Sequence, residues 1–304
     1  MNQVLKSLLI IPYIIYLCIE ALVMKLIPRS LLYKNLEGEV VLITGGGSGI
    51  GRLLALRFSL LGCRIVIWDI NDKGNLETSA LVKNFGGECY SYVCDITNRE
   101  KVYELAKTVK EQVGPVTILV NNAGIVTGNL LLDCPDDMIE KTFQINALSH
   151  FWMLKAFLPD MIAANYGHVV TISSMAGISG CAKLVDYSSS KFAAVGLHEG
   201  LCCELRKQNV DGIKLTLICP FFINTGMFTG INTGVIGLLE PDYVADEIVS
   251  AVRCNKDMLI LPTSLSWLFL FKSLFPVSVG LTIHDLLKSQ CIMDNFIGRD
   301  SKKR

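Results

Sequence analysis

The sequence is short of charge and has no excess of either sign. Charged residues make up 18% of the 304 residues, while 51% are hydrophobic. Soluble domains usually carry about 25% charged residues, and a disordered chain needs still more charge and less hydrophobicity. The 28 basic and 28 acidic residues cancel, so the chain lacks the positive field that holds a nucleic-acid backbone. We therefore expect a folded protein that binds no nucleic acid and is more apolar than a purely soluble one.

Zinc-type cysteine pairs are also absent. None of the eleven cysteines forms a Cys-x-x-Cys pair, and only four histidines are present, so no metal site is expected. An odd number of scattered cysteines does not indicate a disulfide framework either. Small, buried, reduced cysteines are typical of a domain that faces the cytosol.

The hydrophobic excess lies at the two ends of the chain. Ser7–Met24 contains one charge, Glu20, and is slightly shorter than the roughly 20 apolar residues of a membrane span. No small-residue cleavage site follows it, which argues against a secretory signal. We predict that residues 1–35 are a hydrophobic membrane anchor, spanning the membrane or lying in its interface; a buried globular helix is the alternative. Basic residues after the segment favour a cytosolic catalytic domain: Lys25, Arg29 and Lys34.

A second apolar stretch, Thr263–Ile283, also contains a single charge, Lys272. Pro276 interrupts it, which argues against a straight span. We predict that residues 263–304 form an apolar segment that lies on a membrane or packs over the entrance of an apolar site. An ordinary C-terminal core helix is the alternative.

Residues 36–262 contain no repeat, linker or charge block, which predicts one catalytic domain. Short apolar runs alternate with segments of helical period, as in an α/β fold with a doubly wound, parallel, seven-stranded sheet of the Rossmann type. The predicted strands are Val40–Ile43, Ile65–Trp68, Tyr90–Val93, Val116–Val120, Val169–Ile172, Leu215–Ile218 and Met258–Leu261. The clearest helical segments are Arg52–Leu61, Arg99–Gln112 and Asp136–Phe157.

A glycine-rich loop follows the first predicted strand and opens a helix. Glycines let the backbone turn tightly and approach a pyrophosphate, whose charge then lies at the helix N-terminus. The spacing is Gly-x-x-x-Gly-x-Gly, which is moderate evidence for a dinucleotide site only because of this strand–helix context. The predicted cofactor contacts here are Thr44, Gly45, Ser48, Gly49, Ile50 and Gly51.

Asp69 ends the second predicted strand, close to the position of a ribose-binding acid. A carboxylate there accepts hydrogen bonds from both ribose hydroxyls and repels a 2′-phosphate. The positions from which a cation could bind that phosphate carry no arginine or lysine: they are Ser48, Ile70 and Asn71. The pattern predicts NAD rather than NADP as cofactor; an aspartate that only caps a turn is the alternative.

Tyr187 and Lys191 are four residues apart, which places them on one face of a helix. A phenol titrates near 10, and a neighbouring ammonium would lower its pKa toward neutrality, so tyrosine could exchange a proton. Ser174 lies thirteen residues before Tyr187, at the end of a strand. Its hydroxyl could hold a substrate oxygen; Ser173 is the alternative. The segment Asn121–Gly124 ends another strand at the same sheet edge, where doubly wound folds bind ligands.

These motifs together resemble the short-chain dehydrogenase/reductase family, from residue 38 to about residue 262. The resemblance implies that Ser174, Tyr187 and Lys191 are catalytic and that Asn146 completes a proton relay with them. It also implies a set of further cofactor contacts. Asp95 would hold the adenine and Thr225 the nicotinamide amide, with Ile96, Asn122, Tyr187, Lys191 and Pro220 beside them.

Further stretches resemble the membrane-bound retinol and 17β-hydroxysteroid dehydrogenase branch of this family: Leu132–Asp136, Lys155–Pro159 and Cys219–Phe222. The branch implies hydride transfer between NAD and a lipophilic alcohol, with all-trans-retinol oxidised to retinal. The branch also implies a location at the endoplasmic reticulum membrane or lipid droplets, and the family as a whole implies a homodimer. Three alternatives are open: a 17β-hydroxysteroid dehydrogenase, an NADPH-dependent retinaldehyde reductase, and a non-catalytic lipid-droplet surface protein.

Overall fold

The computed structural model describes residues 3–234, 236–267, 272, 274–286 and 288–298. The chain divides into two compact units, Met1–Asn35 and Leu36–Arg304. The first contains helix α1 (Gln3–Leu26), with Pro12 inside it, and the short helix α2 (Arg29–Leu32). Within the described part of the chain, no helix combines the length and apolarity needed to cross a membrane.

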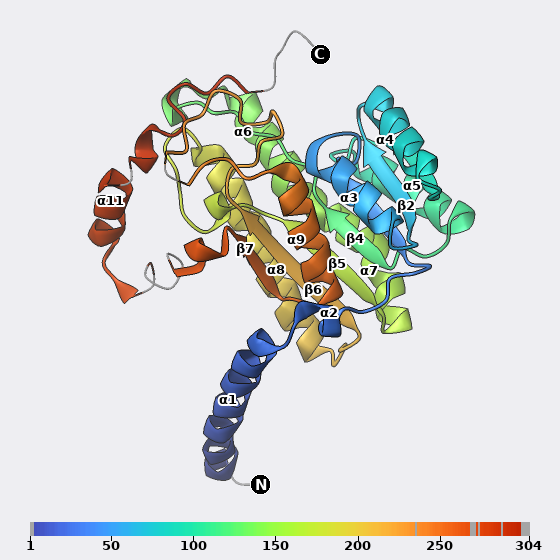
Figure 1. Ribbon diagram of the computed structural model, residues 1–304, viewed down its shortest axis with the longest axis horizontal. Coiled ribbons are helices and arrows are strands. Elements are labelled where there is room, and N and C mark those ends of the chain that lie inside the picture. Colours follow the sequence, from blue (N-terminus) through green and yellow to red (C-terminus); the bar gives the residue numbers. More distant parts are fainter. Residues whose placement is uncertain (1–2, 235, 268–271, 273, 287, 299–304) are drawn as a thin grey trace. The chain divides into compact units, whose positions relative to one another are not determined.

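The second unit is built on one seven-stranded sheet in which every strand pair is parallel (Figure 1). The strand order is β3-β2-β1-β4-β5-β6-β7. The chain therefore reverses its direction of winding between β1 and β4, which is where doubly wound sheets bind their ligands. The predicted α/β fold is confirmed. The strands are β1 (Val40–Thr44), β2 (Arg64–Asp69), β3 (Cys89–Val93), β4 (Ile118–Asn121), β5 (Gly167–Ile172), β6 (Ile213–Pro220) and β7 (Met258–Leu261).

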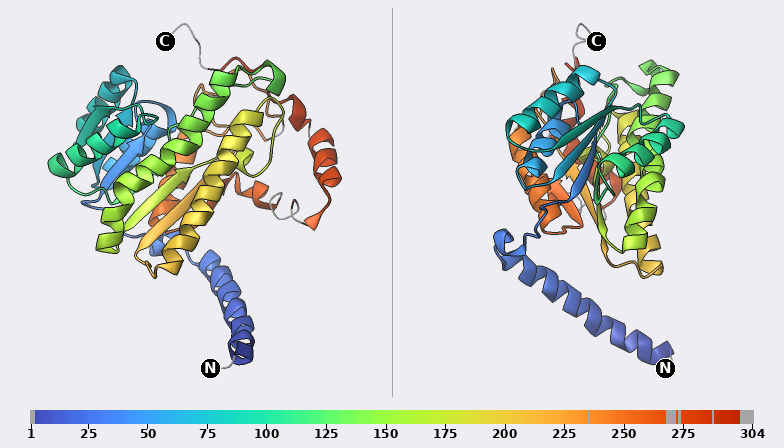
Figure 2. Two further views of the ribbon diagram at one scale, coloured as in Figure 1. Left: turned by 180° about the vertical axis from the view of Figure 1, so that it is seen from behind. Right: turned by 90° about the vertical axis from the view of Figure 1, so that its right-hand side faces the viewer.

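Helices cover both faces of this sheet (Figure 2). Val41 and Ile43 of β1 pack on one side, against α3 (Gly49–Ser59), α4 (Asp72–Asn84) and α9 (Pro241–Arg253). Val40 and Leu42 pack on the other side, against α5 (Arg99–Gln112), α7 (Ser149–Ala164) and α8 (Val185–Lys207). Because successive side chains of a strand point to opposite faces, a strand that is covered on both sides must be continuously apolar. All five residues of β1 are buried.

The helical segment predicted over Asp136–Phe157 contains one turn of a different geometry. The chain forms α6 (Asp136–Phe143), then a wider π-helical turn, η2 (Gln144–Leu148), and then α7. A π turn inserts one extra residue into a helix and often lies at a functional site. Here it contains Asn146, which is completely buried. The segment predicted to be helical is helical throughout, but the π turn at Asn146 was not predicted.

The C-terminal part of the second unit packs on the long loop that follows β6. It contains η4 (Thr263–Leu265), α11 (Val277–Leu286) and η5 (Ser289–Cys291). Residues 268–271, 273, 287 and 299–304 of the predicted apolar segment lie outside the described residues. The Asn232 amide donates to the Ile292 carbonyl (3.0 Å), and the Ile297 amide donates to the Thr229 carbonyl (2.9 Å). These hydrogen bonds hold the C-terminal tail against the loop that follows β6. Two further short turns are η1 (Leu131–Asp133) and η3 (Met175–Gly177).

Candidate active site

A cavity of about 2650 Å³ opens at the carboxyl ends of the strands. A single small-molecule site usually occupies roughly 300–1,000 Å³, so this cavity has room for a cofactor and a substrate together. The glycine loop, the ends of β2 to β6 and the C-terminal segment all contribute to its wall. Predicted site residues in this wall are Gly45, Ser48, Gly49, Ile50, Asp69, Asp95, Ile96, Asn122, Ser174, Tyr187, Lys191, Pro220 and Thr225.

The glycine loop is shaped as a cradle for a phosphate group. Gly45 and Gly49 have φ angles of +68° and +53°, values that side chains other than glycine rarely adopt. A Cβ atom on Gly51 would lie 2.2 Å from the Gly45 carbonyl oxygen, so only glycine allows the helix α3 to begin this close to the turn. These features fit the pyrophosphate of a dinucleotide at the N-terminus of α3.

Thr44 and Asn122 hold the glycine loop in place through hydrogen bonds between the ends of β1 and β4. The Thr44 hydroxyl accepts hydrogen bonds from the amides of Asn122 (3.0 Å) and Ala123 (3.1 Å). In return, the Asn122 side-chain amide donates to the Thr44 carbonyl at 2.8 Å. Both side chains therefore join the end of β1 to the end of β4 and fix the shape of the cradle.

Asp69 is held in place by two backbone amides. Its Oδ2 accepts from the Gly47 amide and its Oδ1 from the Asn71 amide, both at 3.0 Å. The carboxylate is partly exposed in the cavity wall. A carboxylate in this position can accept from ribose hydroxyls, so the residues present fit a dinucleotide with an unmodified ribose.

The remaining predicted cofactor contacts lie along the same wall. Asp95 is exposed, and its Oδ1 accepts from the amide (2.9 Å) and the hydroxyl (2.7 Å) of Thr97. Ile96 is buried beside it. On the far side of the cavity, the Thr225 amide donates to the Ile223 carbonyl (2.9 Å), just beyond Pro220 at the end of β6.

The structure brings Ser174, Tyr187 and Lys191 together. Lys191 Nζ lies 5.7 Å from the centroid of the Tyr187 ring and donates to the Ile172 carbonyl at 2.8 Å. The Ser174 hydroxyl donates to the Pro220 carbonyl (3.4 Å) and accepts from the Ala176 amide (3.1 Å). The Ser173 hydroxyl instead donates to the backbone carbonyl of Lys191 (3.1 Å). This contact gives Ser173 a structural role and favours Ser174 as the group that meets a substrate.

Burial controls the protonation of the tyrosine–lysine pair. Burial raises the pKa of Tyr187 to about 12, and a hydrogen bond with Ser174 opposes that rise. Burial also lowers the pKa of Lys191 to about 8. The expected lowering of the Tyr187 pKa by Lys191 is therefore not met in this geometry. Both side chains are almost completely enclosed, and removal from water disfavours the charged form of each.

Asn146 connects the cofactor side of the cavity to helix α8. Its Oδ1 accepts from the Ile125 amide, and its Nδ2 donates to the Ile125 carbonyl, both at 2.9 Å. The same Nδ2 donates to the Ser190 hydroxyl at 3.1 Å. The side chain thus fixes the strand-end segment 121–125 next to Lys191.

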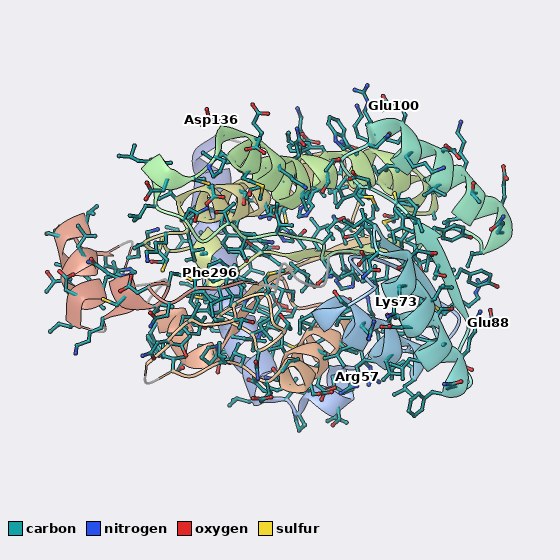
Figure 3. All side chains as sticks on the ribbon, turned by 90° about the horizontal axis from the view of Figure 1, so that it is seen from above. Arg57, Lys73, Glu88, Glu100, Asp136 and Phe296 are labelled. Atoms are coloured by element: carbon teal, nitrogen blue, oxygen red, sulfur yellow. The ribbon has the colours of Figure 1, made fainter. Side chains whose placement is uncertain are left out.

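Sequence reasoning missed an aromatic wall next to Tyr187. The Tyr187 and Phe228 rings meet edge to face with centroids 6.0 Å apart, and Phe228 and Phe222 do so at 4.8 Å. Phe296 packs on Phe228 at 6.5 Å and is labelled in Figure 3. Ile292 and the fully buried Met293 complete this cluster. Only the Phe221-Phe222 pair after β6 gave any signal in the sequence.

His150 is a second residue that sequence reasoning did not place at the site. It is buried on α7, one helical turn after Asn146. Burial, with a smaller contribution from the Lys191 charge, lowers the pKa of His150 to about 3. The scattered histidines gave no indication that one of them lies near Lys191.

Known proteins resemble this chain over most of its length. Residues 39–235 match the family described as short chain dehydrogenase. Epidermal retinol dehydrogenase 2 of Homo sapiens is 48% identical over 94% of this chain and 93% of its own. Estradiol 17-beta-dehydrogenase 11 of Rattus norvegicus is 43% identical over 91% of this chain and 92% of its own.

Solved structures agree with the sequence matches. A short-chain dehydrogenase/reductase from Burkholderia phymatum, in complex with NAD, has a TM-score of 0.72 and 25% identity over 78% of this chain and 93% of its own. A metagenomic short-chain oxidoreductase, in complex with NADP, has a TM-score of 0.64 and 27% identity over 75% of this chain and 97% of its own. The fold, the cavity and these similarities lead to one conclusion: the chain belongs to the short-chain dehydrogenase family.

Proposed function

We propose that this protein oxidises a lipophilic alcohol with NAD, and that all-trans-retinol is its substrate. One observation carries the proposal: the Tyr187 side chain lies between the dinucleotide cradle and an apolar aromatic wall. The similarity to epidermal retinol dehydrogenase 2 supports a retinoid as substrate.

The glycine loop, Asp69 and the segment 121–125 would hold NAD, which when bound supplies the hydride acceptor. Asp95 and Ile96 would contact its adenine end, and Pro220 and Thr225 its nicotinamide end. Asp69 supports NAD over NADP, because the negatively charged 2′-phosphate of NADP would lie close to this carboxylate and be repelled by it.

Tyr187 would remove the hydroxyl proton of the alcohol while the carbinol carbon gives up its hydride and becomes the carbonyl carbon of retinal. Ser174 would hold the alcohol oxygen, since its hydroxyl shares a hydrogen bond with Tyr187. Removal of this proton requires Tyr187 as the phenolate, which a protonated Lys191 would stabilise against the effect of burial. Asn146 would keep the segment 121–125 and helix α8 in register, so that the proton can leave past Lys191.

The substrate side of the cavity suits a long apolar molecule. Phe222 and Phe228 line the cavity, and their aromatic edges offer contacts to a conjugated chain. Helix α11 also lines the cavity, and several of its apolar side chains are exposed: Val277, Leu281 and Leu286. These observations support delivery of substrate from a membrane or lipid droplet. We therefore place the protein at the endoplasmic reticulum or lipid droplets, with residues 1–35 as anchor and the catalytic unit in the cytosol.

Exposed apolar side chains on α7 and α8 support a homodimer. Phe151 on α7 and Phe192 on α8 are 47% and 41% exposed. A second copy of the chain that packs on these helices would remove them from water.

A 17β-hydroxysteroid dehydrogenase is the second candidate function, because estradiol 17-beta-dehydrogenase 11 is similar over nearly the same length. Asp69 argues against an NADPH-dependent retinaldehyde reductase. The enclosed set of Ser174, Tyr187 and Lys191 argues against a lipid-droplet surface protein without catalysis.

One assay separates these functions. Membranes that contain the full chain would be incubated with all-trans-retinol or estradiol, each with NAD or NADP. Formation of retinal with NAD is the expected result. Turnover of estradiol alone would replace the proposal by the second candidate, and no turnover of either alcohol would overturn both.

A further inference from the structure

An ion pair lies directly beside the glycine loop. Arg52, at the start of α3, places Nη2 2.8 Å from Oε2 of Glu77 on α4. The same nitrogen donates to the Gly47 carbonyl at 2.6 Å, and Nε donates to the Thr78 hydroxyl at 3.0 Å. Thr78 is fully buried and donates to the Gly46 carbonyl at 3.0 Å. The guanidinium is therefore engaged by the loop and by α4 at the same time.

The Gly47 peptide links this guanidinium to Asp69. Its amide donates to Asp69 Oδ2 and its carbonyl accepts from Arg52. A Cβ on Gly74 would lie 2.8 Å from the Gly47 carbonyl oxygen, so the first turn of α4 packs tightly against the same peptide. The Gly47 peptide thus lies between the Asp69 carboxylate, which can bind a ribose, and the Arg52 guanidinium, which could bind a phosphate.

Guanidinium groups are strong ligands for phosphate, because their paired donors match phosphate oxygens. Arg52 lies within one peptide of Asp69 yet is not among the residues that line the cavity. Backbone carbonyls and the Thr78 hydroxyl also hold the guanidinium, but among these partners only Glu77 is charged, so its loss would leave a cation that an anion attracts more strongly. Glu77 and the Gly47 carbonyl accept from the same Nη2 of Arg52, and the Glu77 carboxylate neutralises the charge of the guanidinium.

We propose that Glu77 determines cofactor specificity by keeping Arg52 out of the cofactor site. Asp69 repels a 2′-phosphate, and Glu77 removes the nearby cation that could compensate for that repulsion. Two carboxylates on neighbouring elements, β2 and α4, then act together against NADP. The inference rests on the proposed use of NAD and adds a positioning residue that does not itself touch the cofactor.

Helix α3 contains a matched control. Arg57 pairs with Asp246 of α9 at 2.8 Å and has a second partner in Asp242, where α3 and α9 meet (Figure 3). This pair resembles the first in chemistry and exposure but does not contact the glycine loop. A second control is Lys73, an exposed cation in the first turn of α4 that is the other candidate for binding a 2′-phosphate.

The test measures the binding of NADH and NADPH to the purified full chain by nucleotide fluorescence, with no turnover involved. We expect Glu77→Gln to reduce the ratio of the NADPH Kd to the NADH Kd by about fivefold. Adding Arg52→Gln to Glu77→Gln should abolish this relative gain in NADPH affinity, whereas adding Lys73→Ala to Glu77→Gln should preserve it. Asp246→Asn should leave the ratio at the wild-type value.

Three results would overturn the inference: an unchanged ratio in Glu77→Gln, a gain that survives Arg52→Gln, or a gain that disappears with Lys73→Ala. A failure of the proposed function is distinguishable from these results. If the wild-type chain already binds NADPH more tightly than NADH, the proposed NAD preference fails whatever Glu77→Gln does. If it prefers NADH and Glu77→Gln does not change that preference, only the role of Glu77 fails.

Discussion

The two halves of the cavity are built in different ways. The cofactor half consists of consecutive strand ends and the turns after them, and its shape is fixed by backbone contacts such as those of Gly47 and Asp69. The substrate half combines three separate segments, η3, the loop after β6 and the C-terminal tail, through side-chain packing among Phe222, Phe228 and Phe296. The cofactor half, whose shape depends on the backbone, tolerates few substitutions of its glycines. In the substrate half, side chains can be exchanged without displacing the backbone.

Glycine substitutions should separate the halves most strongly. Gly51→Ala would place a Cβ 2.2 Å from the Gly45 carbonyl oxygen and displace the turn. We expect NADH binding to weaken by about 100-fold, from strain of the size seen in overpacked cores. Gly180 lines the substrate half, and a Cβ there would meet nothing within 4 Å. Gly180→Ala should therefore bind NADH like the wild type. Binding by Gly51→Ala within threefold of wild type would contradict the comparison.

Two buried histidines, His150 and His198, predict sensitivity to acid. Burial lowers the pKa of His150 to about 3 and that of His198 to about 4. Both values lie below the ordinary 6.5, so the unfolded chain takes up the protons first as the pH falls. The stability present above pH 6.5 should decline toward pH 4, by about 2 kcal/mol per histidine at pH 5.

Urea unfolding at pH 7 and pH 5 checks this prediction. His150→Leu should reduce the difference in unfolding free energy between the two pH values by about 2 kcal/mol. An unreduced difference in this variant would show that the imidazole is protonated in the folded protein, contrary to its burial.

Changes in the aromatic wall should affect the substrate alone. Phe222→Ala removes a ring that lines the cavity and packs on Phe228, and we expect the KM for all-trans-retinol to rise about tenfold, from the lost apolar contact area. The Kd for NADH should stay within twofold. Phe85→Ala, an exposed phenylalanine at the end of α4, provides the control and should change neither constant. An equal loss of NADH binding in Phe222→Ala would show that the halves are not independent.

The sequence predicted the cofactor half because its determinants are local. Continuous apolar runs located every strand to within about two residues, and the loop, Asp69 and the Tyr187–Lys191 spacing follow directly from strand ends and helical period. The π turn at Asn146 was not predicted, because apolar residues continue with helical spacing on both sides of it. The role of Asn146 was implied only by the family resemblance.

The substrate half could not be predicted for a different reason. Phe228 and Phe296 meet only because the C-terminal tail returns to the loop after β6, and no local pattern indicates that contact. The sign of the Tyr187 pKa shift was also missed. Helical spacing shows that a lysine is near, but it does not show that both groups are buried from water.

Substitution of the tyrosine hydroxyl tests the central claim most directly. Tyr187→Phe keeps the ring that packs on Phe228 and removes only the group proposed to take the substrate proton. Retinol turnover with NAD and the Kd for NADH would be measured on the same preparation. We predict that turnover falls by about a thousandfold while NADH still binds. Turnover within tenfold of wild type, with binding intact, would contradict the assignment of this phenol as the proton acceptor.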